Sequence, residues 1–196
     1  MNGIGGPRGI GGKVDGIAPR PAVHGGDDMT LIGEFDPADQ LLLMQGLEAA
    51  AVLISTSSLG RKEETASEGF AMANHVLESA SEHIAHPLLA SIIQALDDRA
   101  AAGGAFPDYG KVVTAPDARD RAMGIVRSAV AAVDAGATPD EASAYRAWLL
   151  GIATAVAQAG KEDQGFLGRG GVMVNDAERA ALAELAALLG LETPAA

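Results

Sequence analysis

The chain has 196 residues, of which 48% are hydrophobic but only 4% aromatic, and its formal net charge is −12. This length suits one domain with an appended segment, and a core filled by alanine and leucine favours helices over a β-sandwich. The acidic balance excludes general nucleic-acid binding and favours cations or basic protein surfaces as partners. The sequence contains no cysteine, which excludes disulfides, thiolate catalysis and cysteine-ligated metals.

Residues 1–34 form a compositional zone of their own, rich in glycine and proline, in which Gly-Ile-Gly-Gly occurs twice. Glycine loses much backbone entropy on ordering and proline interrupts helices, so we expect a flexible tail followed by a folded domain at residues 35–196. The functional alternative is a short linear element that docks on a partner through apolar side chains. These side chains are Ile4, Ile10, Val14 and Ile17.

Three helices are expected in the first part of the folded domain. Asp36 as N-cap and Pro37 at the first helical position open a leucine-rich helix. Apolar residues three and four positions apart predict a second helix over residues 61–84. Pro87 begins a third helix, which ends near residue 102.

Three more helices are expected in the second part, and their starts carry local signals. Thr114 and Asp117 resemble a capping box, and Thr138 and Glu141 form a complete one with proline after the threonine. In a capping box the two side chains satisfy backbone N–H groups that the first helical turn leaves without partners. Helices are therefore predicted to begin directly after Thr114 and Thr138.

The predicted helices read as two rough copies of one pattern: an alanine-rich helix, a glycine-marked bend and an acidic amphipathic helix. The copies fall in residues 35–102 and 115–192, with a loop around Pro107 between them. Asn175 and Gly190 are expected to bound the last helix as its N-cap and its C-terminal glycine. We therefore predict an all-α protein with about six helices, arranged as hairpins in a compact bundle.

No signal peptide and no membrane insertion are expected. The longest charge-free apolar run, residues 147–160, is shorter than the roughly 20 residues that a bilayer requires. The run over residues 40–60 is longer but carries Glu48, Gln45 and several serines. We expect buried helices at both places and a cytoplasmic location.

Two groups of residues are candidate metal ligands. His75, Glu78 and Glu82 are three and four residues apart, so they share a helix face and could converge on a divalent cation. Asp163 and Asp176 flank the loop before the last helix, where carboxylates could bind calcium or magnesium. The competing interpretations are a solvated polar face for the first group and favourable helix-dipole contacts for the second. We predict no cofactor, with a divalent cation as the alternative.

The glycine-rich loop over residues 165–171 invites comparison with phosphate-binding loops. However, no predicted strand precedes it and no lysine–serine or lysine–threonine pair follows it. We interpret its glycines as structural, so that replacing them by alanine destabilises the fold while replacing Arg169 has little effect. No serine–histidine arrangement for nucleophilic catalysis is present, and Tyr145 and Trp148 are expected to be core side chains.

The segment from Ala153 to Leu191 resembles the terminal part of TerB-like domains, the tellurite-resistance family of small acidic helical bundles. The matching motifs are Ala155-Val-Ala-Gln-Ala159, Asp176-Ala-Glu178 and Leu188-Leu-Gly-Leu191. The chain from Tyr145 onward is also similar to uncharacterised bacterial all-helical proteins with a GFLGxGG loop. The first resemblance implies a helical bundle and a stress-response protein that binds a divalent cation.

The sequence as a whole predicts a non-enzymatic interaction or scaffold protein. It would bind a protein partner or self-associate, with the N-terminal tail as its docking arm. The alternative is the cation-binding function that the TerB-like resemblance implies.

Overall fold

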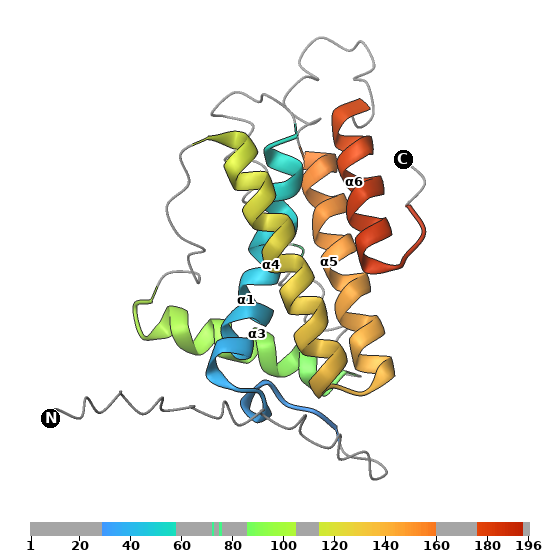
Figure 1. Ribbon diagram of the computed structural model, residues 1–196. Coiled ribbons are helices and arrows are strands. Elements are labelled where there is room, and N and C mark those ends of the chain that lie inside the picture. Colours follow the sequence, from blue (N-terminus) through green and yellow to red (C-terminus); the bar gives the residue numbers. More distant parts are fainter. Residues whose placement is uncertain are drawn as a thin grey trace, which may run out of the picture.

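The computed structural model describes residues 29–57, 72, 75, 86–104, 114–159 and 176–193. Within these ranges the chain is helical and has no strand, which confirms the all-α prediction (Figure 1). A short 3₁₀ helix and five α-helices are described: η1 (Ile32–Glu34), α1 (Pro37–Ser55), α3 (Pro87–Ala101), α4 (Ala115–Gly136), α5 (Pro139–Ala159) and α6 (Asp176–Leu189). The helix expected over residues 61–84 lies outside the described residues except for Met72 and His75, which are helical.

Helix α1 is the centre of the bundle. It packs most extensively against α4 and then against α5, while α6 lies against α5 and α3 crosses one end of the bundle beside η1 (Figure 1). Leucines and alanines cover most of the circumference of α1, and a helix that is apolar nearly all round is stable only when neighbours surround it. By length and composition alone α1 could cross a membrane, but half of that stretch is buried inside the bundle.

Contacts among the described helices run between the two predicted halves, residues 35–102 and 115–192. Among the described helices, the main neighbours of α1 are α4 and α5, which belong to the other predicted half, and one hydrophobic cluster joins side chains from all five. The described residues therefore form one core rather than two.

The capping box predicted at Thr138 is present, and at Thr114 the structure has the N-cap hydrogen bond without the reciprocal one from the backbone of Thr114. Thr114 Oγ1 accepts from the Asp117 N–H (3.3 Å). At the start of α5, Thr138 Oγ1 accepts from the Glu141 N–H (3.3 Å), while Glu141 Oε2 accepts from the Thr138 N–H (3.2 Å) and hydroxyl (2.8 Å). Asp36 occupies the N-cap of α1, although its side chain makes no capping hydrogen bond. Local sequence signals therefore fix where α4 and α5 begin.

The C-terminal end of α6 also follows the prediction. Gly190 has a φ of 69°, a left-handed conformation that favours glycine, and directly follows the last helical residue. The N–H of Leu191 donates to the carbonyl of Ala186 (2.9 Å) and closes the last turn. The predicted N-cap, Asn175, lies outside the described residues.

The two large aromatic residues of α5 anchor the core, as predicted. Tyr145 has no exposed surface and Trp148 is 2% exposed. Tyr145 Oη donates to the carbonyl of Leu43 in α1 (2.8 Å), so the phenol satisfies its hydrogen-bonding group inside an otherwise apolar contact. Burial raises the pKa of the Tyr145 phenol far above its ordinary value. The phenol therefore ties α5 to α1 as a neutral donor.

Candidate functional site

The chain joins the bundle before residue 35, the predicted start of the folded domain. Thr30 is 7% exposed, and its N–H donates to Oε1 of Glu141 in α5 (3.1 Å). The N–H of Ile32 donates to Oγ of Ser91 in α3 (2.8 Å), and the Ile32 side chain is buried. Two backbone groups of this short segment thus find partners on two different helices. Residues 29–35, called the root below, belong to the folded domain.

The aromatic ring of Phe35 completes the root. It is 8% exposed and lies over Gly136 at the end of α4. A Cβ atom on Gly136 would be 2.6 Å from Cε1 of Phe35, closer than such atoms approach, so the ring sits where only glycine leaves room. The carbonyl of Phe35 also accepts from Nε2 of Gln40 (2.8 Å). The root is therefore fixed to α3, α4 and α5 together.

The carboxylate of Glu141 is the electrostatic centre of this attachment. Burial of Glu141, which is 4% exposed, opposes its charge, but hydrogen bonds from Thr138 and Thr30 outweigh burial and lower the pKa below the ordinary value of 4.5. One oxygen serves the capping box at the start of α5 and the other holds the root. The ionised carboxylate therefore couples a local cap to a long-range contact.

The root also presents apolar side chains to solvent. Among the described residues, the large hydrophobic side chains that are exposed are those of Met29 (67%), Leu31 (48%) and Leu41 (39%). Met29 and Leu31 flank Thr30, whose backbone is held by Glu141, so the attachment fixes the backbone while leaving these two side chains able to contact another surface. Sequence reasoning missed this feature because it assigned residues 29–34 to the tail.

A second surface feature is an open cleft of about 500 Å³ beside α5, called the α5 cleft below. It is lined by His75, Ala147, Leu150, Gly151, Thr154, Ala155, Gln158, Leu191 and Glu192. Its walls thus come from α5, from the position of His75 and from the residues after α6.

Small residues form the floor of the α5 cleft. Ala147, Gly151 and Ala155 are four residues apart on α5 and share one face of the helix. The hydroxyl of Thr154 donates to the carbonyl of Leu150 (2.8 Å), so this polar group is already satisfied within the helix. An apolar group that enters the cleft would therefore displace water without breaking the hydrogen bond between the Thr154 hydroxyl and the Leu150 carbonyl. The four-residue spacing of small side chains was a signal from which the cleft could have been predicted.

His75 lies in this cleft rather than on a fully solvated face. Its side chain is half-buried, and a Cβ atom on Gly151 would be 2.7 Å from its Nε2. The imidazole thus rests on the backbone of α5 at the one position without a side chain. Of the other proposed ligands in its group, Glu78 and Glu82 lie outside the described residues.

The second proposed metal group is likewise described only in part. Asp176 pairs with Arg179 one turn further along α6, and Asp163 lies outside the described residues. Asp176 lies at the start of α6 and Leu191 just beyond its end, so the length of the helix, roughly 20 Å for its 14 residues, separates them. Because Leu191 lines the cleft together with His75, Asp176 lies far from His75. No group of three or more potential ligands is found in the described ranges.

The remaining predicted site residues fall outside the described parts of the chain. Ile4, Ile10, Val14 and Ile17 precede the described residues, and the glycine-rich loop over residues 165–171 with Arg169 falls between α5 and α6 outside them. Their predicted roles stay predictions.

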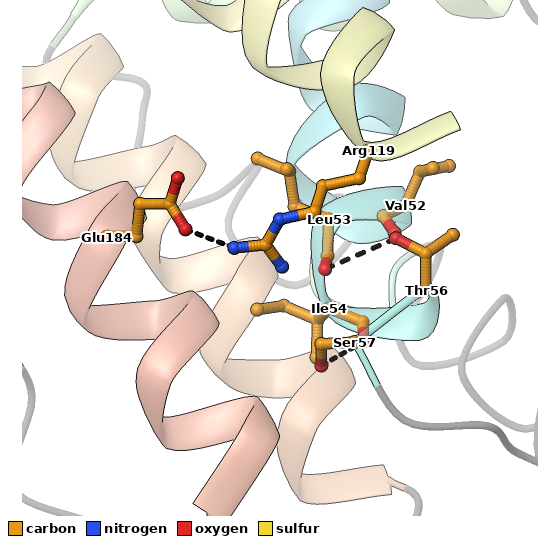
Figure 2. A network of polar contacts seen from close by, with 7 residues as sticks. All are labelled: Val52, Leu53, Ile54, Thr56, Ser57, Arg119 and Glu184. Atoms are coloured by element: carbon orange, nitrogen blue, oxygen red, sulfur yellow. Dashed lines mark hydrogen bonds and ion pairs between the residues drawn. The ribbon is translucent and has the colours of Figure 1, made fainter. Parts of the chain in front are cut away.

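Other polar contacts in the bundle serve the fold. At the C-terminal end of α1 the hydroxyl of Thr56 donates to the carbonyl of Val52, and that of Ser57 donates to the carbonyl of Ile54 (2.7 Å each). An ion pair between Arg119 and Glu184 lies close by (Figure 2). The hydroxyls satisfy carbonyls that the last helical turn leaves open, and the ion pair links α4 to α6. These contacts close one end of the bundle and serve its stability.

Comparisons with protein-family models, with curated protein sequences and with solved structures find no match to this chain.

Proposed function

We propose that this protein is a non-enzymatic interaction protein whose N-terminal arm, residues 1–28, docks on a protein partner while the helical bundle serves as its scaffold. The observation that carries the proposal is the root. The arm leaves the bundle from a backbone fixed at Thr30 and Ile32, and exposed apolar side chains stand at the same place.

A fixed root favours this function for an energetic reason. Ordering each backbone residue costs on the order of 1–2 kcal/mol, so an arm that binds a partner gains when the residues beside it are already ordered. Met29 and Leu31 would then extend the apolar contact made by Ile4, Ile10 and Ile17 without a further ordering cost. The interface would begin on the bundle and continue along the arm.

Two truncations test the proposal and separate the arm from the root. A variant that lacks residues 1–28 is expected to keep the helix content and melting temperature of the full chain. It should lose capture of the partner from native cell extract, compared by quantitative mass spectrometry. A variant that lacks residues 1–34 also removes the hydrogen bonds of Thr30 and Ile32 and is expected to melt at a lower temperature. Unchanged partner capture by the first variant would contradict the proposed function.

Point substitutions refine the test within the arm. Ile10→Asp and Ile17→Asp should reduce partner capture about tenfold or more, because a charge enters an apolar contact. Ala18→Asp adds the same charge beside Ile17 and serves as the matched control, with a much smaller effect expected. If the captured partner is a second copy of the chain, sedimentation velocity will show a dimer that these substitutions dissociate. Equal effects of all three substitutions would mean that charge rather than apolar contact matters, against the proposal.

The cation-binding alternative has no specific support among the described residues. Most of its candidate ligands lie outside them, and the two that are described, His75 and Asp176, have other contacts. We therefore propose the interaction function alone.

A further inference from the structure

We propose that the α5 cleft is the resting place of the chain's own N-terminal arm, so that residues 1–20 bind this cleft until a partner displaces them. The inference rests on the proposed function, in which the arm is the part that the partner captures. It adds a regulatory step, because the partner must compete with an intramolecular contact. Three features of the structure point to the arm as the occupant of the cleft.

The first feature is the chemistry of the α5 cleft. Ala147 and Ala155 give it small apolar side chains on either side of Gly151, which the His75 imidazole covers, and Gln158 and Glu192 lie at its exposed rim. Such a surface suits a segment in which isolated aliphatic side chains alternate with glycine, because the glycines let the backbone approach closely. Residues 1–20 have this composition, with isoleucines among repeated glycines.

The second feature is reach. The root is fixed at Glu141, and Gly151 lies ten residues further along the same helix, a rise of about 15 Å. The eight residues 21–28 can span about 26 Å when extended. Residues 1–20 can therefore arrive at the cleft of the same molecule. A short tether of this kind gives an effective concentration in the millimolar range, so even a weak site is occupied.

The third feature is charge. Residues 1–20 contain three basic residues and one acidic residue, a net charge of +2, while the other 176 residues contain 11 basic and 25 acidic residues, a net charge of −14. Residues 1–20 are thus the cationic part of an acidic protein, whereas Asp27 and Asp28 bring the whole arm to a net charge of zero, and Glu192 places a carboxylate at the rim of the cleft. Two whole molecules, each at −12, repel one another. Charge therefore favours docking within one molecule over exchange between two.

Site-specific crosslinking of the full chain tests where the arm lies. A photoreactive phenylalanine is placed at Gln158 or at Glu192, both exposed and both lining the cleft, and at exposed Ala131 on α4 as the control. We expect the two cleft probes, but not the control, to give crosslinked monomers in which peptide mapping finds residues 1–20. Attachment of the cleft probes to residues 58–85, to residues 160–175 or to a second molecule would overturn the inference. So would the absence of any product.

Binding in trans supplies an independent measurement. A fluorescent peptide of residues 1–20 should bind the variant that lacks residues 1–28 and bind the full chain at least tenfold more weakly, because the tethered arm competes. Ala147→Trp in the truncated protein fills the cleft from an exposed position and should weaken peptide binding at least tenfold, while Ala131→Trp should not. Equal binding by the truncated and full chains, or by the two tryptophan variants, would overturn the inference.

The same variants separate this inference from the proposed function. In the full chain, Ala147→Trp should increase partner capture, because it releases the arm. If removal of residues 1–28 abolishes partner capture while no crosslink to the arm forms, the proposed function stands and the resting contact is refuted. If the crosslink forms but removal of the arm leaves partner capture unchanged, the proposed function is refuted.

Discussion

The contact between Gly46 of α1 and Tyr145 of α5 allows a sharp test of how the bundle is held together. A Cβ atom on Gly46 would be 2.3 Å from Oη of Tyr145, 3.2 Å from Cβ of Ala129 and 3.6 Å from Cζ of Tyr145. The first distance is far below any tolerated contact, whereas the last is ordinary van der Waals contact. The phenol is fully buried and hydrogen-bonded to Leu43, so it cannot swing away into solvent. We therefore expect the hydroxyl to be the specific obstacle to a side chain at position 46.

The magnitudes follow from opposing effects. Gly46→Ala should gain up to about 1 kcal/mol of helix propensity, lose about 1–3 kcal/mol to overpacking and lose about 1 kcal/mol if the hydrogen bond of Tyr145 breaks. We expect a net destabilisation of about 2 kcal/mol. Tyr145→Phe alone should cost about 1 kcal/mol, because it removes the hydrogen bond and little volume. In the double variant the clash with the hydroxyl is absent and only the 3.2 Å approach to Ala129 remains, so adding alanine at position 46 should destabilise the protein much less than in the parent.

The free energy of unfolding is measured by urea denaturation, followed by far-UV circular dichroism and by the fluorescence of Trp148. We expect a coupling of about 1–3 kcal/mol between the two substitutions, well beyond the roughly 0.5 kcal/mol found for independent sites. Gly124→Ala is the matched control, because a Cβ atom added to this helical glycine of α4 would enter open space, and the change should be neutral or stabilising. A neutral Gly46→Ala, or strict additivity, would refute the packing argument.

The root and the helix caps give further predictions. Glu141→Gln should lower the unfolding free energy at pH 7 by about 1–3 kcal/mol. Because the folded pKa of Glu141 is lowered, its ionised carboxylate stabilises the protein above pH 4.5, and this stabilisation disappears as the pH falls through the folded pKa. The urea midpoint of the variant should therefore fall less than that of the parent on acidification. Gly136→Ala should displace the Phe35 ring and speed hydrogen exchange at the amide of Ile32, and unchanged exchange would contradict the proposed packing. Thr114→Ala should cost about 1 kcal/mol through the lost cap, measured by thermal unfolding, and an effect near zero would mean that the cap is dispensable.

Much of the helical framework follows from local sequence signals. The N-cap at Thr114 and the capping box at Thr138 mark the starts of α4 and α5, and Gly190 marks the end of α6, because each signal acts within one helical turn. The burial of Tyr145 and Trp148 follows equally from their place on the apolar face of α5. These features need no knowledge of how the helices pack.

The tertiary structure decided the rest, and Glu141 shows why. From the sequence this residue is the acidic member of a capping box, and its Oε2 has that role. Its Oε1 binds the backbone of Thr30, which is 111 residues away, and no signal near either residue announces the contact. Three other features are decided in the same way: the packing of α1 against α4, the contact of the Phe35 ring with Gly136, and the cleft beside Gly151. Each depends on two surfaces that meet only after the helices pack, whereas propensities and caps act within a single turn of one helix.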